Sequence, residues 1–314
     1  MLVGYTVDKG ALRRIAVASS IELVPEIRWL DLNNPTEQER QWVRAAYGQE
    51  LQFLEELSEI EASARYYRDE SGLHLNLYFL NAVNGSTRNV NVAFTVNDGR
   101  LYTLHADDVP ELRAYYQHAS AHPELDDDPL SILLGIVDLR VGLLADTYER
   151  LQTELETLGR ELFRVNERSM TRVIETLARI EDTNGKARLA MLENQRAFSR
   201  LLSGSQAPGH ADVINEVLRD IDSLLTHANG LSERIKFLMD SALGLINLAH
   251  SKRLNIFTVL SVILMPPTLI ASIYGMNFRH MPEIDWLWGY PLALAVMLAV
   301  AVVPMLYLKR RGWL

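Results

Sequence analysis

The C-terminal end of the chain carries two long stretches in which nearly every position is apolar. Leu254 to Tyr274 is 21 residues without a charged side chain, and Trp286 to Leu308 is another 23. A helix needs about 20 apolar residues to cross about 30 Å of hydrocarbon, so each stretch is long enough to span a bilayer once. A pair of buried core helices is the alternative, but core helices rarely lack charge over such lengths.

Basic residues at the two ends of this pair predict its orientation. Lys252 and Arg253 precede the first stretch, and residues 309–311 (Lys-Arg-Arg) follow the second. Because cytoplasmic flanks are enriched in Lys and Arg, both chain termini are expected in the cytoplasm and the loop 275–285 outside. Trp286 then lies at the outer interface, where aromatic residues are common.

Residues 1–105 alternate between short polar and apolar runs, which predicts a mixed region of strands and short helices. Thr36 and Glu39 form a capping box at the start of a predicted helix through Ala46. Asn97-Asp98-Gly99 is a hairpin turn signal between two apolar runs. The predicted strands include residues 27–32, 73–80, 90–96 and 100–104.

From Pro110 onward the apolar residues recur at spacings of three and four, which predicts helices. Asp128 followed by Pro129 is a helix start signal, and residues 203–210 (SGSQAPGH) are the only clear break before the end of the first span. Residues 211–274 are therefore predicted to form one helix of about 95 Å, which would reach from the cytoplasm into the membrane. The helix predicted to start at Pro129 carries an apolar stripe. It comprises Leu130, Leu133, Leu134, Val137, Val141, Leu144 and Leu151.

The first span also carries a polar stripe. At about 100° per residue its hydroxyl-bearing residues and one methionine fall within an arc of roughly 100°. Such a stripe suits a helix that lines an axis shared by several copies, although Ser and Thr can also bond to their own backbone carbonyls. Pro266 and Pro267 should bend the helix. The stripe comprises Ser251, Thr258, Ser261, Met265, Thr268 and Ser272.

Charge is distributed unevenly around this boundary. The first 253 residues hold 27 basic and 38 acidic side chains, whereas the rest hold four and two. An acidic region disfavours nucleic acid as a partner and suits cations. The absence of Cys excludes disulfides, thiolate zinc sites and cysteine nucleophiles. No glycine-rich phosphate loop follows a predicted strand, so no nucleotide site is expected, and the N-terminus has no apolar core of a secretory signal.

Residues near the end of the first span resemble a known family. Tyr274-Gly275-Met276-Asn277-Phe278 closes the span, Met281-Pro282-Glu283 follows in the loop, and the chain ends in a basic segment with Trp313-Leu314. Together with residues 60–65 (IEASAR) and 92–95 (VAFT), these features are similar to the proteobacterial magnesium and cobalt branch of the CorA family of divalent-cation transporters.

The resemblance implies an overall organisation. It implies a funnel-shaped homopentamer in the inner membrane with a cytoplasmic α/β/α domain of α+β class and a long helical stalk. The expected segments are a cytoplasmic domain with stalk (1–250), a pore-lining span (251–274), a periplasmic loop (275–285), a second span (286–308) and a basic cytoplasmic terminus (309–314). The pore-facing positions implied by the resemblance are Ser251, Leu254, Ser261, Met265, Thr268 and Ser272.

The resemblance also places a selectivity ring at Gly275, Met276 and Asn277. Mg²⁺ holds its inner waters tightly, and the neutral amide of Asn277 is suited to accept hydrogen bonds from those waters. Met276 is a poor ligand for a hard cation and is expected to pack against its neighbours. An ordinary helix C-cap turn is the alternative for all three. Glu283 could attract cations outside, although Arg279 weakens a simple anionic ring.

The implied function is influx of Mg²⁺ and also Co²⁺, with Ni²⁺ as a further candidate ion, down the electrochemical gradient, with closure by cytoplasmic Mg²⁺ bound between subunits. No other cofactor is expected. Candidate regulatory carboxylates are Asp220 and Asp222 on the long helix and the run 126–128 (Asp-Asp-Asp), although a solvated face or helix cap explains each of them.

Three other functions remain open at this point. A zinc transporter of the same superfamily is the leading alternative, and His118 with His122 could share a transition metal, although such a pair is more often plain surface. A membrane-anchored scaffold that conducts nothing is the second. An enzyme is the least favoured, because no nucleophile with a matching base stands out in the sequence.

Overall fold

The computed structural model describes residues 1–52, 65–83, 86–122, 126–164, 167–204, 209–276 and 286–310. The chain divides into two compact units. One comprises Met1–Arg164 with Thr171–Met239, and the other comprises Val165–Met170 with Asp240–Leu314.

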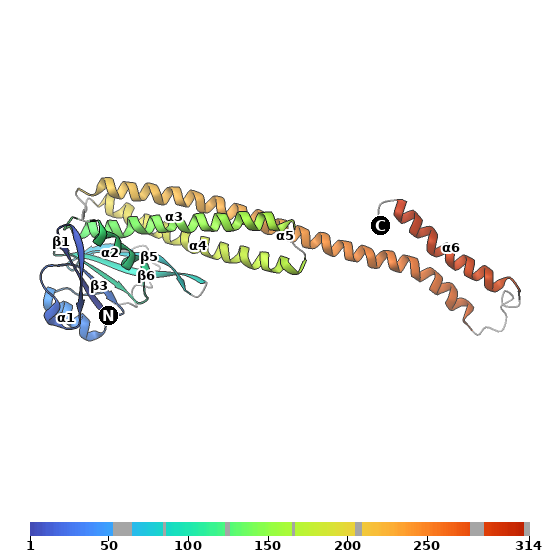
Figure 1. The fold of residues 1–314 in the computed structure, drawn as a ribbon, viewed down its shortest axis with the longest axis horizontal. Helices are drawn as coiled ribbons and strands as arrows, with labels where there is room; N and C mark the ends of the chain where they lie inside the picture. The colour runs from blue at the N-terminus through green and yellow to red at the C-terminus, as the bar shows by residue number, and fades with distance from the viewer. Residues whose placement is uncertain are drawn as a thin grey trace. The chain divides into compact units, whose positions relative to one another are not determined.

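The first unit contains a seven-stranded sheet in the order β2-β1-β3-β7-β6-β5-β4 (Figure 1). All neighbouring strands are antiparallel except β3 and β7, which pair in parallel. The strands are β1 (Leu2–Asp8), β2 (Ala11–Val17), β3 (Ile27–Asn33), β4 (Tyr66–Asp69), β5 (Gly72–Val83), β6 (Ser86–Asn97) and β7 (Arg100–His105). The predicted strands 27–32, 73–80, 90–96 and 100–104 all lie within them.

The turn between β6 and β7 has the chemistry that its sequence indicated. Asp98 and Gly99 both have positive φ, at 45° and 70°. Two such residues in a two-residue loop match the right-handed twist of the flanking strands, and Asp-Gly tolerates this conformation at little cost. The predicted hairpin is confirmed, and its register pairs Asn97 with Arg100.

One face of the sheet is covered by α1 (Glu37–Tyr47), which follows a short 3₁₀ helix, η1 (Ser20–Glu22). The Thr36 hydroxyl accepts a hydrogen bond from the Glu39 backbone N–H at 3.2 Å, and the Glu39 carboxylate accepts one from the Thr36 N–H at 2.8 Å. The predicted capping box is therefore confirmed. Val43 of α1 is fully buried in a core cluster with Leu30 and Leu32 of β3.

The opposite face is covered by α2 (Pro110–Ala121) and α3 (Pro129–Leu162). Trp29 of β3 stacks on Tyr5 of β1 with ring centroids 4.2 Å apart and meets Tyr115 of α2 edge-on at 6.0 Å. Residues adjacent in a strand point to opposite faces, so Trp29 faces α2 while Leu30 faces α1. The sheet thus lies between two helical layers, and the predicted α/β/α arrangement is confirmed.

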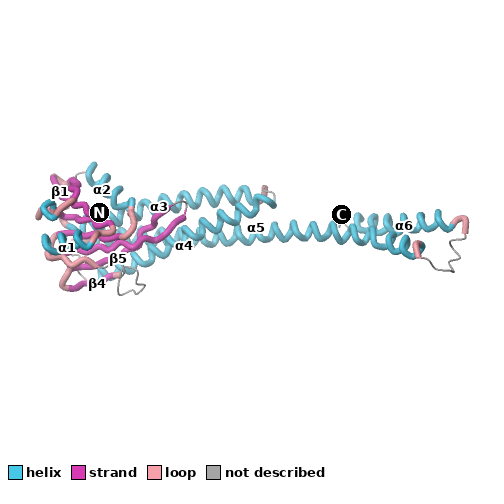
Figure 2. The backbone as a smooth tube through the Cα atoms, turned by 90° about the horizontal axis from the view of Figure 1, so that it is seen from below, coloured by secondary structure: helices cyan, strands magenta, loops and turns pink. Residues whose placement is uncertain are grey.

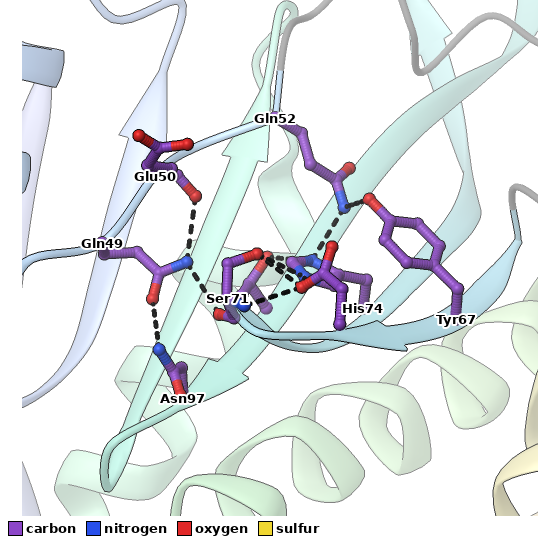
Figure 3. A network of polar contacts seen from close by, with 9 residues as sticks. Gln49, Glu50, Gln52, Tyr67, Ser71, His74 and Asn97 are labelled. Carbon is purple, nitrogen blue, oxygen red and sulfur yellow. Dashed lines mark hydrogen bonds and ion pairs between the residues drawn. The ribbon is translucent and has the colours of Figure 1, made fainter.

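A polar network ties the segment after α1 to the β4–β5 edge (Figure 3). His74 is 1 % exposed, and its Nε2 lies 3.1 Å from Asp69 while its Nδ1 lies 2.9 Å from the Gln52 amide nitrogen. Because that amide nitrogen can only donate, Nδ1 must accept, and the proton sits on Nε2 facing Asp69. Burial lowers the pKa of His74, against the opposing effect of Asp69, so the neutral ring is the stable form.

Helices α3, α4 and the first part of α5 make up the rest of the first unit. The prediction of a single break in this region was wrong, because α3 and α4 are separate helices. α3 ends at Leu162 and α4 spans Glu167–Ser203, whereas residues 203–210 were expected to be the only break. Helix α3 closes with a tight turn in which the Arg164 N–H donates to the Glu161 carbonyl at 2.7 Å. No Gly or Pro marks this turn in the sequence, so the spacing of apolar residues runs on through it.

Helix α5 (Ala211–Tyr274) is continuous over 64 residues, as predicted, and includes Pro266 and Pro267. Its first part packs with α3 and α4 (Figures 1 and 2). The α5 residues buried there are Ile214, Val217, Ile221, Leu224, Leu225, Ala228, Leu231, Ile235 and Leu238. Their three- and four-residue spacing is the apolar face of a soluble amphipathic helix.

The second unit contains the rest of α5 and α6 (Gly289–Arg310). Trp286 and Trp288 lie in a turn just ahead of α6, where the Gly289 N–H donates to the Trp286 carbonyl at 2.9 Å. Lys309 and Arg310 occupy the last turn of α6. None of the residues of α6 is buried within the chain.

Candidate functional site

The membrane part of α5 and all of α6 expose their apolar side chains. The most apolar 18-residue segments of the two helices have mean hydropathies of 2.1 and 2.3, yet only 6 % and 0 % of those segments are buried inside the chain. Ile256 is 67 % exposed and Phe257 68 %. Core helices of a soluble protein would hide such residues, so the alternative of buried core helices is excluded for these two segments. Lipid is the solvent that suits them.

The polar stripe on α5 lies along a shallow groove of about 500 Å³. Every stripe residue is exposed within the single chain. Pro266 and Pro267 lie outside the stripe, on roughly the opposite side of the helix at about 100° per residue. The groove is lined by Leu260, Ser261, Leu264, Met265, Thr268, Leu269 and Ser272.

The threonine hydroxyls of the stripe bond to their own helix. Thr258 donates to the Leu254 carbonyl at 2.9 Å, and Thr268 donates to the Leu264 carbonyl at 2.7 Å. This is the backbone bonding that the sequence left open as an alternative. It uses the hydroxyl hydrogen but leaves the oxygen lone pairs free, so each threonine presents an acceptor to whatever lies beside the stripe.

The serines at 251, 261 and 272 and the side chains of Leu254 and Met265 complete the set. Leu254 is 53 % exposed and Met265 is 74 % exposed. Among the residues that the structure describes, the hydroxyls of these three serines have no hydrogen-bond partner, and each is exposed. A single chain therefore leaves this whole face of α5 uncovered.

The end of α5 differs from an ordinary glycine cap. The helix stops at Tyr274, the Gly275 N–H donates to the Ala271 carbonyl at 2.9 Å, and the Met276 N–H donates to the Ile273 carbonyl at 3.3 Å. Gly275 does not have the positive φ of the usual left-handed cap. A Cβ at Gly275 would lie 3.2 Å from the Ala271 carbonyl oxygen, which is a tight contact. Asn277 and Glu283 lie outside the described residues.

The two candidate carboxylates on α5 do not lie together. Residues 220 and 222 are about 200° apart around a helix, and Asp222 is exposed away from the groove that Asp220 lines. That groove joins α3 to α5 and brings Asp220 to Asp138. Partial burial raises the pKa of Asp138, and the nearby charges of Asp220 and Glu216 raise it further.

Sequence reasoning missed Asp138 and Glu216. Asp138 lies on α3 and Glu216 on α5, and no sequence pattern indicates that two positions so far apart in the chain come close together. The only available signal was the acidic excess of the region as a whole, which does not identify residues.

The acidic run 126–128 is engaged in structural contacts. Asp127 pairs with Arg28 at 2.9 Å. Asp128 accepts from the Ser131 N–H at 3.2 Å, which confirms the predicted cap of α3, and also pairs with His210 at 3.0 Å. A capping role accounts for this carboxylate without a bound metal.

The two histidines at the end of α2 lie against each other. The rings of His118 and His122 stack with centroids 4.6 Å apart, and His122 Nδ1 lies 3.1 Å from the His118 carbonyl. Within the described part of the chain, no group of three His, Asp or Glu side chains converges as metal ligands.

An N-terminal α/β unit followed by two exposed apolar helices, the first with a polar stripe, defines an integral membrane protein with a large water-facing region. The profile of the family described as CorA-like Mg²⁺ transporter protein matches residues 25–310. The chain belongs to this family, which confirms the resemblance and agrees with the prediction that the chain is not an enzyme.

Relatives cover the full length of the chain. It is 38 % identical to the magnesium transport protein CorA of Salmonella typhimurium and to that of Escherichia coli K12, and 39 % identical to that of Pectobacterium atrosepticum. Each alignment covers 100 % of both chains. The solved structure of the CorA magnesium transporter from Methanocaldococcus jannaschii matches with a TM-score of 0.81 at 19 % identity over 100 % of this chain and 99 % of that one. The fold is thus the CorA fold.

Proposed function

We propose that the chain carries Mg²⁺ across the cytoplasmic membrane. The proposal is supported by full-length identity of 38–39 % to proteins named magnesium transport protein. The observation that carries it in this molecule is the polar and exposed face of α5, which lines a shallow groove. Polar side chains in lipid are costly unless they face protein or water, and such residues mark ion pathways.

One copy of α5 encloses nothing, so the pathway needs several copies. We take the assembly to be a homopentamer, a number that follows the family resemblance, with the stripe of each copy facing a common axis. Both termini then lie in the cytoplasm, because Lys252, Arg253, Lys309 and Arg310 flank the two spans on one side. Lipid covers the remaining apolar faces.

The stripe is suited to a hydrated ion. Mg²⁺ releases its inner waters reluctantly, and those waters point their hydrogens outward. Thr258 and Thr268 offer oxygen acceptors whose hydrogens are already used by the helix. A ring of such acceptors holds the water shell without trapping the ion. The membrane potential supplies about 2.3 kcal/mol per charge per 100 mV, or roughly 4.6 for Mg²⁺, so no nucleotide is needed.

The outer mouth is assigned to Gly275, Met276 and Asn277. The Asn277 amides would accept from the waters of the incoming ion, as the stripe does further in. Met276 would hold the turn, and a side chain at position 275 would lie close to the Ala271 carbonyl. Glu283 in the loop would raise the local cation concentration. Co²⁺ and Ni²⁺ carry the same charge and also hold water shells, so they are further substrates.

Cytoplasmic Mg²⁺ bound between subunits is proposed to close the pathway. Asp220 with Asp138 across the groove is one proposed ligand group, and Asp222, on another side of α5, would contribute separately. The pKa of Asp138 is raised first by its partial burial and then by repulsion from Asp220 and Glu216, and a divalent cation would relieve that repulsion.

Flux into liposomes tests the proposal. The purified chain should conduct Mg²⁺ and Co²⁺, and Asn277→Ala should lower Mg²⁺ flux at least about ten-fold, the effect of about 1.4 kcal/mol in the barrier. Thr268→Val should lower flux while Thr268→Ser retains it, and Ile263→Val on the opposite face is the control. Normal Mg²⁺ flux by Asn277→Ala would contradict the mouth assignment. Zinc flux coupled to a pH gradient without Mg²⁺ flux would overturn the function.

A further inference from the structure

A buried polar cluster interrupts the apolar interior of the three-helix bundle. Asn184 of α4 is fully buried, and its amide donates to the Ala228 carbonyl of α5 at 3.2 Å and to the Ser232 hydroxyl of α5 at 2.8 Å. The Ser232 hydroxyl in turn donates to the Glu181 carboxylate of α4 at 3.3 Å. These bonds connect α4 to α5 and to no other helix.

The cluster is not optimised for stability. The Asn184 carbonyl oxygen is buried without a hydrogen-bond partner among the described residues, and the Tyr148 hydroxyl of α3 is another such atom elsewhere in the bundle. Burial raises the pKa of Tyr148, so its hydroxyl stays protonated. Unpaired buried polar atoms cost free energy that an apolar side chain of similar size would not. A cluster that costs stability needs another reason to be there.

The apolar layers on either side consist of Leu, Ile and Ala. Because apolar contacts have no direction, they distinguish one axial position of α5 against α4 from another less sharply than a hydrogen bond does. The α5 residues in these layers are Ile221, Leu224, Leu225, Leu231 and Ile235. Asn184 discriminates, because a slip of one turn would carry the Ser232 hydroxyl about 5.4 Å away from its amide. A single buried Asn is the best-attested device for setting register between packed helices.

We infer that Asn184 is a positioning residue that fixes the axial register of α5 against α4. The inference rests on the proposed function for its consequence. Helix α5 is continuous to Tyr274, so a slip of one turn would move the stripe residues by about 5.4 Å along the helix axis. Asn184 therefore selects one axial position of the ion-facing helix and sets the point from which any gating motion starts.

The same helix provides a matched control. Asn194 of α4 is also buried, at 1 % exposed, but its amide group bonds only to the backbone of Tyr78 in β5, at 3.1 and 3.3 Å. Asn184→Leu and Asn194→Leu thus remove the same chemical group from the same helix. Only the first removes bonds to α5.

Register is measured directly by pulsed EPR on the full-length protein in lipid nanodiscs. The natural chain has no Cys, so nitroxides attach only where Cys is introduced. Ser199 of α4 and Glu233 of α5 are both exposed and lie far apart along the two packed helices, so they are the labelling positions and a slip along the axis changes the distance between them directly. Labelled chains are diluted with unlabelled ones so that distances within one chain dominate.

The parent and Asn194→Leu should each give one narrow distance distribution. Asn184→Leu should broaden it or add a second population displaced by about one helical turn. A distribution for Asn184→Leu identical to that of the parent overturns the inference. Ser232→Ala, which removes one of the two acceptors, should broaden the distribution less, and Ser232→Thr should restore it.

Transport gives the functional readout. In liposomes, Asn184→Leu should change the internal Mg²⁺ concentration that halves influx by about five-fold or more, while Asn194→Leu should leave it near the parent value. An altered register with unchanged inhibition would refute the link to gating. Absence of Mg²⁺ flux in the parent would refute the proposed function, while the EPR result would still decide the register.

Discussion

The two halves of α5 form one continuous helix, but their apolar side chains have different surroundings. Over residues 211–239 every third or fourth side chain is buried against α3 and α4. Over residues 254–274 Val259 is the single buried hydrophobic residue, although the apolar content is much higher. The apolar face is therefore narrow and covered in the first half, and broad and uncovered in the second.

The difference shows where each half obtains its stability. The first half buries its apolar surface within its own chain, as a soluble amphipathic helix does. The second half has little to pack against within the chain, so lipid and further copies must supply its surroundings. Its stripe reverses the usual pattern, because the polar side is the side expected to face protein and water.

Placing a charge on the two sides of the second half should give the largest effect. Ile263→Asp puts a charge on the half-buried apolar side opposite the stripe, among hydrocarbon and apolar side chains, at a cost of about 3 kcal/mol, and we expect loss of membrane-inserted protein. Asp at Ser261, on the stripe, would face water and should insert normally. Quantification of carbonate-resistant protein in membranes checks this. Equal insertion of both variants would show that the stripe does not face water.

Trimming one methylene in each half should give an intermediate effect. Ile221→Val shortens a side chain that is 1 % exposed in the bundle and should destabilise it by about 1 kcal/mol. Ile256→Val shortens one that is 67 % exposed and should leave bundle unfolding unchanged. Thermal unfolding of both full-length variants in detergent, followed by circular dichroism, makes the comparison. A larger loss for Ile256→Val would contradict it.

Neutralising Asp138 of α3, which lies beside the first half of α5, should give the smallest effect, and that effect should depend on pH. Folding raises the pKa of Asp138, so the folded chain binds more protons than the unfolded chain above the ordinary value of 3.8. Ionised Asp138 therefore costs stability at neutral pH and costs nothing below that value. Asp138→Asn should raise the melting temperature slightly at pH 7, and the gain should vanish as the pH falls below 3.8. A gain independent of pH would exclude repulsion as its cause.

Features with a local cause were predictable from the sequence. The Thr36 cap, the Asp98-Gly99 turn and the Asp128 cap each depend on residues within a few positions of one another. The continuity of α5 was also predictable, because no strong break occurs between its ends. The turn between α3 and α4 was not, since its residues have no distinctive turn chemistry and the apolar spacing passes through it.

The features of the candidate site also divide into those that the sequence predicts and those that depend on tertiary packing. The stripe on α5 follows from helical periodicity alone, and its positions agree with the groove lined by Ser261, Met265, Thr268 and Ser272. The separation of Asp220 from Asp222, the approach of Asp138 to Asp220 and the bonds from Asn184 to α5 depend on how helices pack. No spacing rule within one segment contains them.

By itself, then, the sequence determined the two membrane spans, the long helix and its polar edge, because hydropathy and periodicity act over neighbouring residues. Only the tertiary structure decided which carboxylates meet, where the helical bundle turns and which buried amide faces α5. Those outcomes depend on contacts between residues far apart in the chain, and such contacts exist only after the helices have packed.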